Sequence, residues 1–186
     1  MLQPLPIPDA PWQSISMDFI FGLPKSIQGN TGIWTIVDHF SKQAHFLPIK
    51  KTIKAKHMAN LFMFHIFKHH GLPNSMVSNR DPCMMSLFWK GLFENLGTKL
   101  NFSSAYHPQT DGQREILNSI VLDLLKSYVG EVAQRNQWEQ YLPLVEYAYN
   151  NIVYTSTGKA SFEIIEGRLK LPLLLKTNDK IFAAHA

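Results

Sequence analysis

The sequence predicts a single α/β domain whose core is a five-stranded mixed sheet flanked by helices. Three β-branched and aromatic runs follow one another near the N-terminus, at residues 14–24, 31–41 and 44–51. Beyond residue 54, helically spaced apolar residues alternate with short apolar runs, which is typical of helices that cover the faces of a sheet. A chain of 186 residues is long enough to bury such a core without disulfides.

The three N-terminal runs predict an antiparallel meander. "SISMDFIFGLP" and "TGIWTIVDHFS" are separated by "KSIQGN", whose Gly and Asn indicate a hairpin. In the third run, "AHFLPIKK", Pro48 lacks a backbone donor. We therefore expect this strand at or near an edge of the sheet.

The rest of the sequence predicts alternating helices and strands. A helix over residues 54–71 is indicated by its apolar spacing and by Gly71 with Pro73 beyond it. The remaining elements are a strand at 74–78, a helix at 86–97, a fifth strand at 98–105, helices at 111–132 and 138–151, and a short turn at 161–167. We expect the fourth strand to lie beside the first. The predicted domain covers residues 12–172, between a Pro-rich extended lead-in at 1–11 and a loose tail at 173–186.

The helix predicted at residues 111–132 is the clearest of all. Its apolar residues form one stripe, made of Ile116, Leu117, Ile120, Val121, Leu124, Leu125 and Tyr128. At helical spacing, Glu115 lies away from the centre of this stripe, so its carboxylate is not expected to contact that core.

Composition and charge narrow the functional classes. The net charge of +4 and the pI near 9.1 favour a polyanionic partner. The single Cys83 excludes an internal disulfide and a multi-cysteine zinc site. No apolar run reaches the roughly 18 residues that a membrane span requires. Gly-rich phosphate loops are absent, so no small-molecule cofactor is expected.

Histidines offer one alternative site. His65 and His69 stand four residues apart on a predicted helix, a spacing that suits two metal ligands. The intervening Glu of a zinc protease and any cysteine partners are missing. Solvated residues on a helix face are therefore the favoured interpretation.

Three polar positions form a second candidate site. Asp18 interrupts an apolar strand, Asn79 follows the predicted fourth strand, and Glu115 opens the long helix. If the strands concerned are neighbours, the three side chains meet at one edge of the sheet. From pattern alone, the favoured explanation is an ordinary strand position for Asp18, a turn residue at Asn79 and helix-start electrostatics for Glu115.

Six segments in order resemble one known family. They are "WQSISMDFIFGLP", "IVDHFSKQAHFLPIKKT", "HHGLPNSMVSNRD", "AYHPQTDGQRE", "WEQYLPLVEYAYNN" and "TSTGKASFEIIEGR". Together they resemble the integrase catalytic core of gypsy-type long-terminal-repeat retrotransposons, especially those of plants, over residues 12–172. The resemblance implies an RNase H-like fold, DNA integration by polynucleotidyl transfer, a homo-oligomer and a nuclear location.

The family carries an Asp, Asp, Glu triad with 35 residues between its last two members. Here Asp18 and Glu115 match the first and third positions, and 35 residues separate Asn79 from Glu115. Asn79 therefore stands where the family has its second Asp. The resemblance implies Mg²⁺ or Mn²⁺ held by Asp18 and Glu115. Losing one acidic ligand is expected to weaken metal binding and to impair catalysis, because Mg²⁺ prefers anionic oxygen.

DNA contacts are expected from the loop before the long helix, from that helix and from nearby cations. The predicted DNA-binding residues are Lys42, Tyr106, His107, Gln109, Gln113, Arg114 and Lys126. The favoured function is thus an integrase core, alone or as a piece of a longer polyprotein, that is impaired at Asn79. The alternative is a non-catalytic module derived from an integrase that binds nucleic acid or oligomerises. An RNase H-type nuclease is less favoured, because the six segments match integrases specifically.

Overall fold

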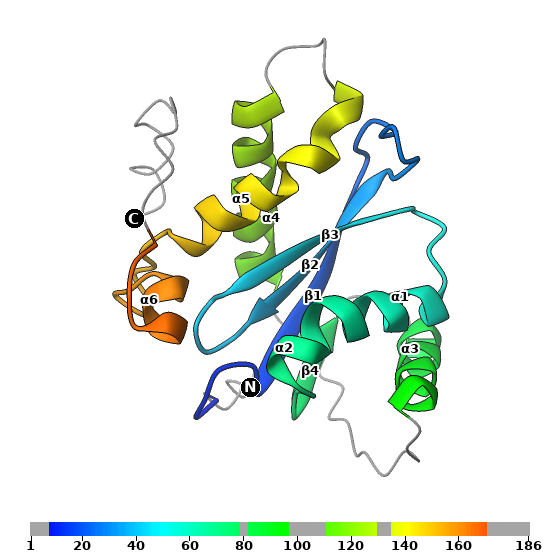
Figure 1. Cartoon of the computed structure of the whole chain (residues 1–186), viewed down its shortest axis with the longest axis horizontal. Coiled ribbons are helices and arrows are strands. Elements are labelled where there is room, and N and C mark those ends of the chain that lie inside the picture. Colours follow the sequence, from blue (N-terminus) through cyan, green and yellow to red (C-terminus); the bar gives the residue numbers. More distant parts are fainter. Residues whose placement is uncertain (1–7, 79–81, 97–110, 130–134, 171–186) are drawn as a thin grey trace.

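The computed structural model describes residues 8–78, 82–96, 111–129 and 135–170, which form a mixed sheet with helices on both faces (Figure 1). The strands are β1 (Ser14–Phe21), β2 (Gly32–Asp38), β3 (Ala44–Ile49) and β4 (Ser75–Ser78). Their order is β3-β2-β1-β4, with β2 antiparallel to both of its neighbours and β4 parallel to β1. The predicted meander and the predicted position of the fourth strand are confirmed.

The described sheet has four strands, whereas the sequence predicted five. The fifth strand was expected at residues 98–105, which lie outside the described residues. The mixed character of the sheet does not depend on it, because the parallel pair formed by β1 and β4 already combines with two antiparallel pairs. The prediction of five strands is therefore not supported.

The helices follow the predicted order with shifted bounds, except that the turn predicted at residues 161–167 is a short helix. They are α1 (Ala55–Phe62), the π-helical η1 (Met63–Phe67), α2 (Lys68–His70), α3 (Pro82–Leu96), α4 (Asp111–Val129), the 3₁₀ helix η2 (Arg135–Tyr141), α5 (Leu142–Asn150) and α6 (Ser161–Glu166). The helix predicted over residues 54–71 is continuous, with one π-helical stretch in its middle. No helix in the described part of the chain is both long and apolar enough to cross a membrane.

Two layers of helices bury the two faces of the sheet (Figure 1). Side chains alternate between the faces along a strand, so Ile15 and Met17 of β1 join the core beneath α1 and α3, while Ile20 joins the core beneath α4 and α5. Asp18 is two residues before Ile20. It therefore lies on the face that α4 covers.

Helix α5 closes the edge of the sheet at β3. The side-chain amide of Asn150 both accepts from Ala44 N, at 2.8 Å, and donates to Ala44 O, at 2.9 Å. One turn earlier on the helix, Glu146 Oε2 accepts from Phe46 N at 2.9 Å. These bonds occupy backbone groups that would otherwise be free to pair with another strand. The edge position predicted from Pro48 is confirmed, since β3 ends the sheet.

Candidate active site

Asp18 lies in the middle of β1, half-buried between fully apolar neighbours. Its partner in β2 is Thr35, whose Oγ1 donates to the backbone oxygen of Asp18 at 3.2 Å. Because Met17 packs into the opposite core, the strand cannot rotate Asp18 away from the α4 face without exposing that buried side chain. The carboxylate is thus held at a defined place between the sheet and α4.

Asn118 is the residue on α4 that meets this carboxylate. Its Nδ2 donates to Asp18 Oδ2 at 2.9 Å, which joins two segments 100 residues apart in the sequence. Position 118 follows position 115 by three residues, so the two are neighbours on the helix surface. Sequence reasoning missed Asn118. The available signal was a polar residue at the margin of the apolar stripe, one turn after Glu115.

The other end of the Asn118 amide has no hydrogen-bond partner within the described part of the chain. Its Oδ1 is buried and accepts no hydrogen bond from the described residues. A buried acceptor without a hydrogen bond is uncommon in a folded protein. It either lowers the stability of the fold or is the place where a water molecule or an ion binds. An amide oxygen beside a carboxylate matches the oxygen ligands that Mg²⁺ and Ca²⁺ take. This pair of residues therefore fits part of a divalent-cation site.

The described side chains do not complete such a site by themselves. Among them, no group of three or more His, Cys, Asp or Glu residues could hold a metal ion. Strand β4 ends at Ser78, which is paired with Met17, and Asn79 lies outside the described residues. The backbone of Glu115 belongs to α4, but its side chain is likewise outside them. The predicted convergence of the three positions thus stays a prediction.

The apolar stripe of α4 holds the helix against the sheet, with one correction. Leu117, Ile120, Val121 and Leu124 are buried as predicted, but Ile116 is 56% exposed. The buried residues centre on the side of the helix that Leu117 and Val121 share, so Ile116 falls at the margin of the stripe and faces solvent.

Comparisons with known proteins place this geometry in context. No family model matches the chain. Over 164 residues, 88% of its length, the chain is 36% identical to the Transposon Tf2-3 polyprotein of Schizosaccharomyces pombe, and the matched part is 12% of that polyprotein. The chain therefore spans about an eighth of the length of the curated relatives it matches.

Solved structures decide the fold. The HTLV-2 integrase catalytic core domain in complex with magnesium aligns with a TM-score of 0.60 and 18% identity, over 83% of this chain and 96% of that one. The simian T-cell lymphotropic virus intasome in complex with PP2A regulatory subunit B56 gamma aligns with a TM-score of 0.63 and 18% identity, over 95% of this chain and 62% of that one. The chain has the fold of an integrase catalytic core.

Of the predicted DNA-binding side chains, the structure describes those of Lys42 and Lys126. Lys42 lies half-buried in the β2–β3 turn, where burial lowers the pKa of its ammonium and the nearby Asp38 carboxylate offsets part of that change. Lys126 is exposed on α4, with its Nζ 3.1 Å from Asp123 Oδ1. Tyr106, His107 and Gln109 lie outside the described residues, as do the side chains of Gln113 and Arg114 in α4.

A second polar cluster lies at the β3 edge of the same core. His45 Nδ1 is 2.9 Å from Glu146 Oε1, and His45 Nε2 is 3.1 Å from His70 Nε2. The ring of His70 stacks on Trp12 with the ring centroids 3.9 Å apart. Burial, followed by the neighbouring His45 and His69, lowers the pKa of His70 to about 4.

The histidines singled out in the sequence border this cluster without a hydrogen bond to it among the described residues, and the ring centroids of His69 and His70 are 6.0 Å apart. His65 and His69 are both exposed, as expected of a solvated helix face. Burial is the first cause that lowers the pKa of His65, and the positive charge of Lys68 is the second.

Proposed function

We propose that this chain is the catalytic core of a gypsy-type retrotransposon integrase whose DNA-joining activity is impaired at position 79. The observation that carries the proposal is the bond from Asn118 to Asp18, which ties the middle of β1 to α4 one turn after Glu115. The similarity to the Tf2 polyproteins and the integrase-core fold support the same assignment.

Asp18 is the carboxylate around which this activity would be organised. It would hold a divalent cation together with Glu115 and the residue at position 79, as the carboxylate and the free amide oxygen nearby allow. When bound, the cation would activate the attacking hydroxyl and stabilise the leaving oxygen of a phosphodiester. The Asn118 amide keeps the Asp18 carboxylate in one orientation, while Thr35 holds the strand beneath it.

Asn79 would weaken this arrangement. An Asn side chain offers a neutral oxygen in place of a charged one, so the cation would lose one anionic ligand. Loss even of groups that orient the ligands costs about 10- to 100-fold in affinity or activity, and loss of a direct ligand should cost more.

The Asn79 substitution also favours a second candidate function. A core that cannot hold its metals well could serve as a nucleic-acid-binding or oligomerising module that no longer catalyses. The HTLV-2 core has been solved in dimeric and trimeric forms, which supports self-association as part of either function. A nuclear location would suit both.

Strand transfer separates the two functions. The unchanged protein should join labelled DNA ends weakly or not at all with Mg²⁺, and Asn79→Asp should raise the yield and the Mg²⁺ affinity measured by calorimetry. Adding Asp18→Asn to that variant is the control and should remove the gain. If Asn79→Asp leaves both readouts unchanged, position 79 is not a metal ligand and the non-catalytic module is the better account.

A further inference from the structure

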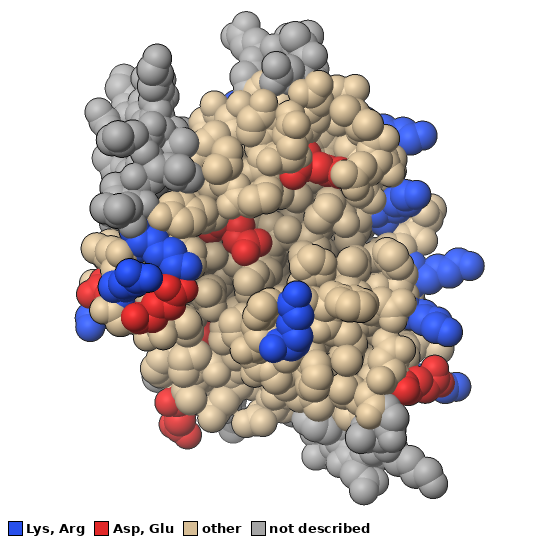
Figure 2. Space-filling view, viewed as in Figure 1, with Lys and Arg blue, Asp and Glu red and all other residues tan. Residues whose placement is uncertain are grey.

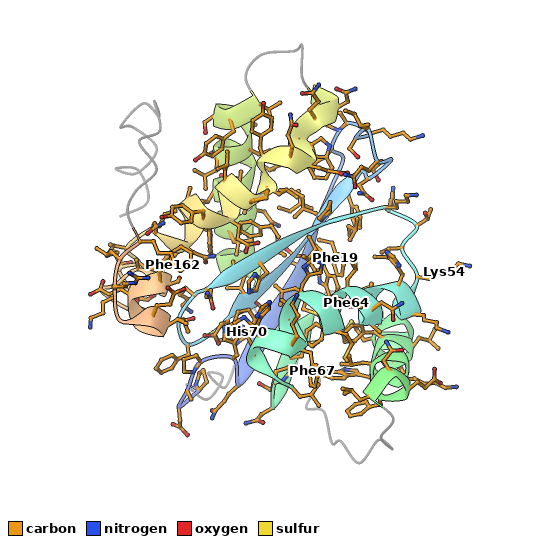
Figure 3. All side chains as sticks on the ribbon, viewed as in Figure 1. Phe19, Lys54, Phe64, Phe67, His70 and Phe162 are labelled. Atoms are coloured by element: carbon orange, nitrogen blue, oxygen red, sulfur yellow. The ribbon has the colours of Figure 1, made fainter. Side chains whose placement is uncertain are left out.

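Exposed lysines gather along one side of the molecule, on the right-hand margin of Figure 2. Six of them, here called the lysine rim, come from the β1–β2 loop, the β3–α1 connection, α1 and α3: Lys25, Lys50, Lys51, Lys54, Lys56 and Lys90. None of the six forms an ion pair with any described acidic side chain. Lys54 is labelled in Figure 3, at the outer margin beside the start of α1.

The upper part of the rim is brought together over a glycine. Gly29 has a positive φ of 86°, and the position its Cβ would occupy is 3.7 Å from Lys50 Cε and 3.8 Å from Lys25 Cε. Two lysine side chains from different loops thus converge where Gly29 leaves room. Like charges this close repel one another unless an anion lies between them.

The lower part of the rim is continuous through helix packing. The Cα of Lys56, in the first turn of α1, is 3.5 Å from the position that a Cβ on Gly91 would occupy in α3. Gly91 follows Lys90 directly, so α1 and α3 meet closely enough to carry the row of cations from one helix to the next.

The loop that presents Lys25 is fixed on both sides of it. The Trp138 indole Nε1 donates to Pro24 O at 2.8 Å, and the Ile27 N donates to Asn136 O at 3.0 Å. Ser26, which follows Lys25, is buried and donates to the carboxylate of Glu139. Lys25 is therefore presented by an anchored backbone, which lowers the entropy that binding would cost.

The rim is unfavourable for the isolated fold. Lys54 is the N-cap of α1 and makes no side-chain cap, while the first turn of the helix contains Lys56 and no acidic residue. Cations at the N-terminal end of a helix oppose its dipole. No acidic residue in the first turn of α1 offsets these two cations. An unfavourable arrangement of this kind indicates that the lysines are retained for a function and not for stability.

The rim begins at a defined end of the sheet. β1 and β3 run in the same direction and end level with each other at Phe21 and Ile49, so Lys50 and Lys51, just after β3, lie at that end of the sheet. Helices α1 and α3, which carry Lys56 and Lys90, cover the face of the sheet opposite to Asp18, so the rim is a surface separate from the proposed active site.

We infer that the lysine rim binds the phosphate backbone of a DNA duplex, in a manner independent of base sequence. The inference rests on the proposed function for its choice of polyanion, since a row of cations that form no ion pair with the described acidic side chains suits regularly spaced phosphates. Ile27, 72% exposed in the loop next to Lys25, is the feature that would favour an anionic membrane surface instead. One exposed apolar side chain is weak support for a membrane beside six cations.

A paired charge reversal tests the rim. The test variant carries Lys50→Glu and Lys54→Glu. The control variant carries Lys68→Glu and Lys159→Glu, which change the net charge by the same amount at exposed positions away from the rim. Binding of a fluorescent duplex is measured by anisotropy from about 50 to 200 mM salt, with a chelator present so that no metal takes part. Matching thermal unfolding of the two variants shows that both are folded.

The rim variant should bind about 10-fold more weakly than the control, and its salt slope should shrink by about 2, because each phosphate contact contributes about 0.9. Equal binding by the two variants would overturn the inference, as would an unchanged protein that binds phosphatidylserine vesicles but not duplex. Because metal is absent, this outcome is independent of the Asn79→Asp result: the rim can fail while the proposed function stands, and the reverse.

Discussion

Two asparagines on neighbouring helices contact the sheet in different ways. Asn150 of α5 is 1% exposed, and both ends of its amide bond to the backbone of Ala44. Asn118 of α4 bonds to Asp18 through one end only, and its buried oxygen has no described partner. Unpaired buried acceptors cost free energy, so a region that retains one is a better candidate for ligand binding than a region that satisfies every group.

The surroundings extend this contrast. Near Asn150, the Glu146 carboxylate accepts a hydrogen bond from Phe46 N and is hydrogen-bonded to His45. The other ring nitrogen of His45 is hydrogen-bonded to His70, which is labelled in Figure 3. The β3 edge is therefore a closed polar network that joins the two helical layers. Asp18, by contrast, is held by Thr35 and Asn118 and stays half-buried. The first region maintains the fold, and the second is where chemistry is proposed.

The largest expected effect is on the closed region. Asn150→Ala removes two hydrogen bonds and leaves the Ala44 N–H and C=O buried without partners, so it should lower the free energy of unfolding by about 2–4 kcal/mol. Urea unfolding followed by circular dichroism measures this.

The control for that experiment is the next residue in the chain. Asn151 donates one bond, to Tyr147 O, and is only partly buried. Asn151→Ala should therefore cost less than about 1 kcal/mol. Equal losses at the two positions would show that the edge closure by α5 contributes little.

An intermediate effect is expected from pH. The folded-state pKa of His70 is about 4, below the ordinary value of 6.5, so the unfolded chain binds more protons between these values. The stability contributed by neutral His70 is then complete above about pH 6.5 and is lost as the pH falls toward 4. Urea unfolding at several pH values should show this decline.

Replacing His70 by an aromatic residue that does not titrate isolates the contribution of its imidazole to the pH dependence. His70→Phe can keep a ring on Trp12 and should flatten the decline between pH 6.5 and 4. His57→Gln, at an exposed position of α1, is the matched control and should leave it unchanged. If the two variants show the same slope as the unchanged protein, the His45–His70 contact does not respond to protons as described.

The sequence predicts one of these regions better than the other. Strand periodicity and Pro48 predict that β3 is an edge strand, because those signals are local. That Glu146 and Asn150 would close that edge is not visible in the sequence, since it depends on how α5 crosses β3 in three dimensions. Family resemblance singled out Asp18, but not its contact with Asn118.

Other departures have similar causes. Ile116 matches the helical stripe in type and spacing, yet it lies at the margin of the buried arc, which only packing defines. The lysine rim comes from two connections and two helices, so no single segment of the sequence displays it. Asn79 was recognised because the family has a carboxylate at this position of its triad. The local sequence gives no such signal, since Asn is common in turns.

The smallest stability effect is expected at the open region. Asn118→Ala removes one bond to a half-buried carboxylate that water can solvate, and it also removes the unpartnered oxygen. These two terms oppose each other, so the free energy of unfolding should change by less than about 1 kcal/mol. Urea unfolding alongside Asn150→Ala checks this ranking, and a larger loss at Asn118 than at Asn150 would reverse it.

The central claim is that the open region holds a divalent cation and the closed region does not. Paramagnetic Mn²⁺ titrated into the isotope-labelled Asn79→Asp protein tests it most directly, by broadening the NMR signals of nearby side-chain amides. The account predicts early loss of the Asn118 amide signal, retention of the Asn150 signal, and no selective loss once Asp18→Asn is added. Equal broadening of both amides, or an Asn118 signal that persists at saturating Mn²⁺, would contradict it.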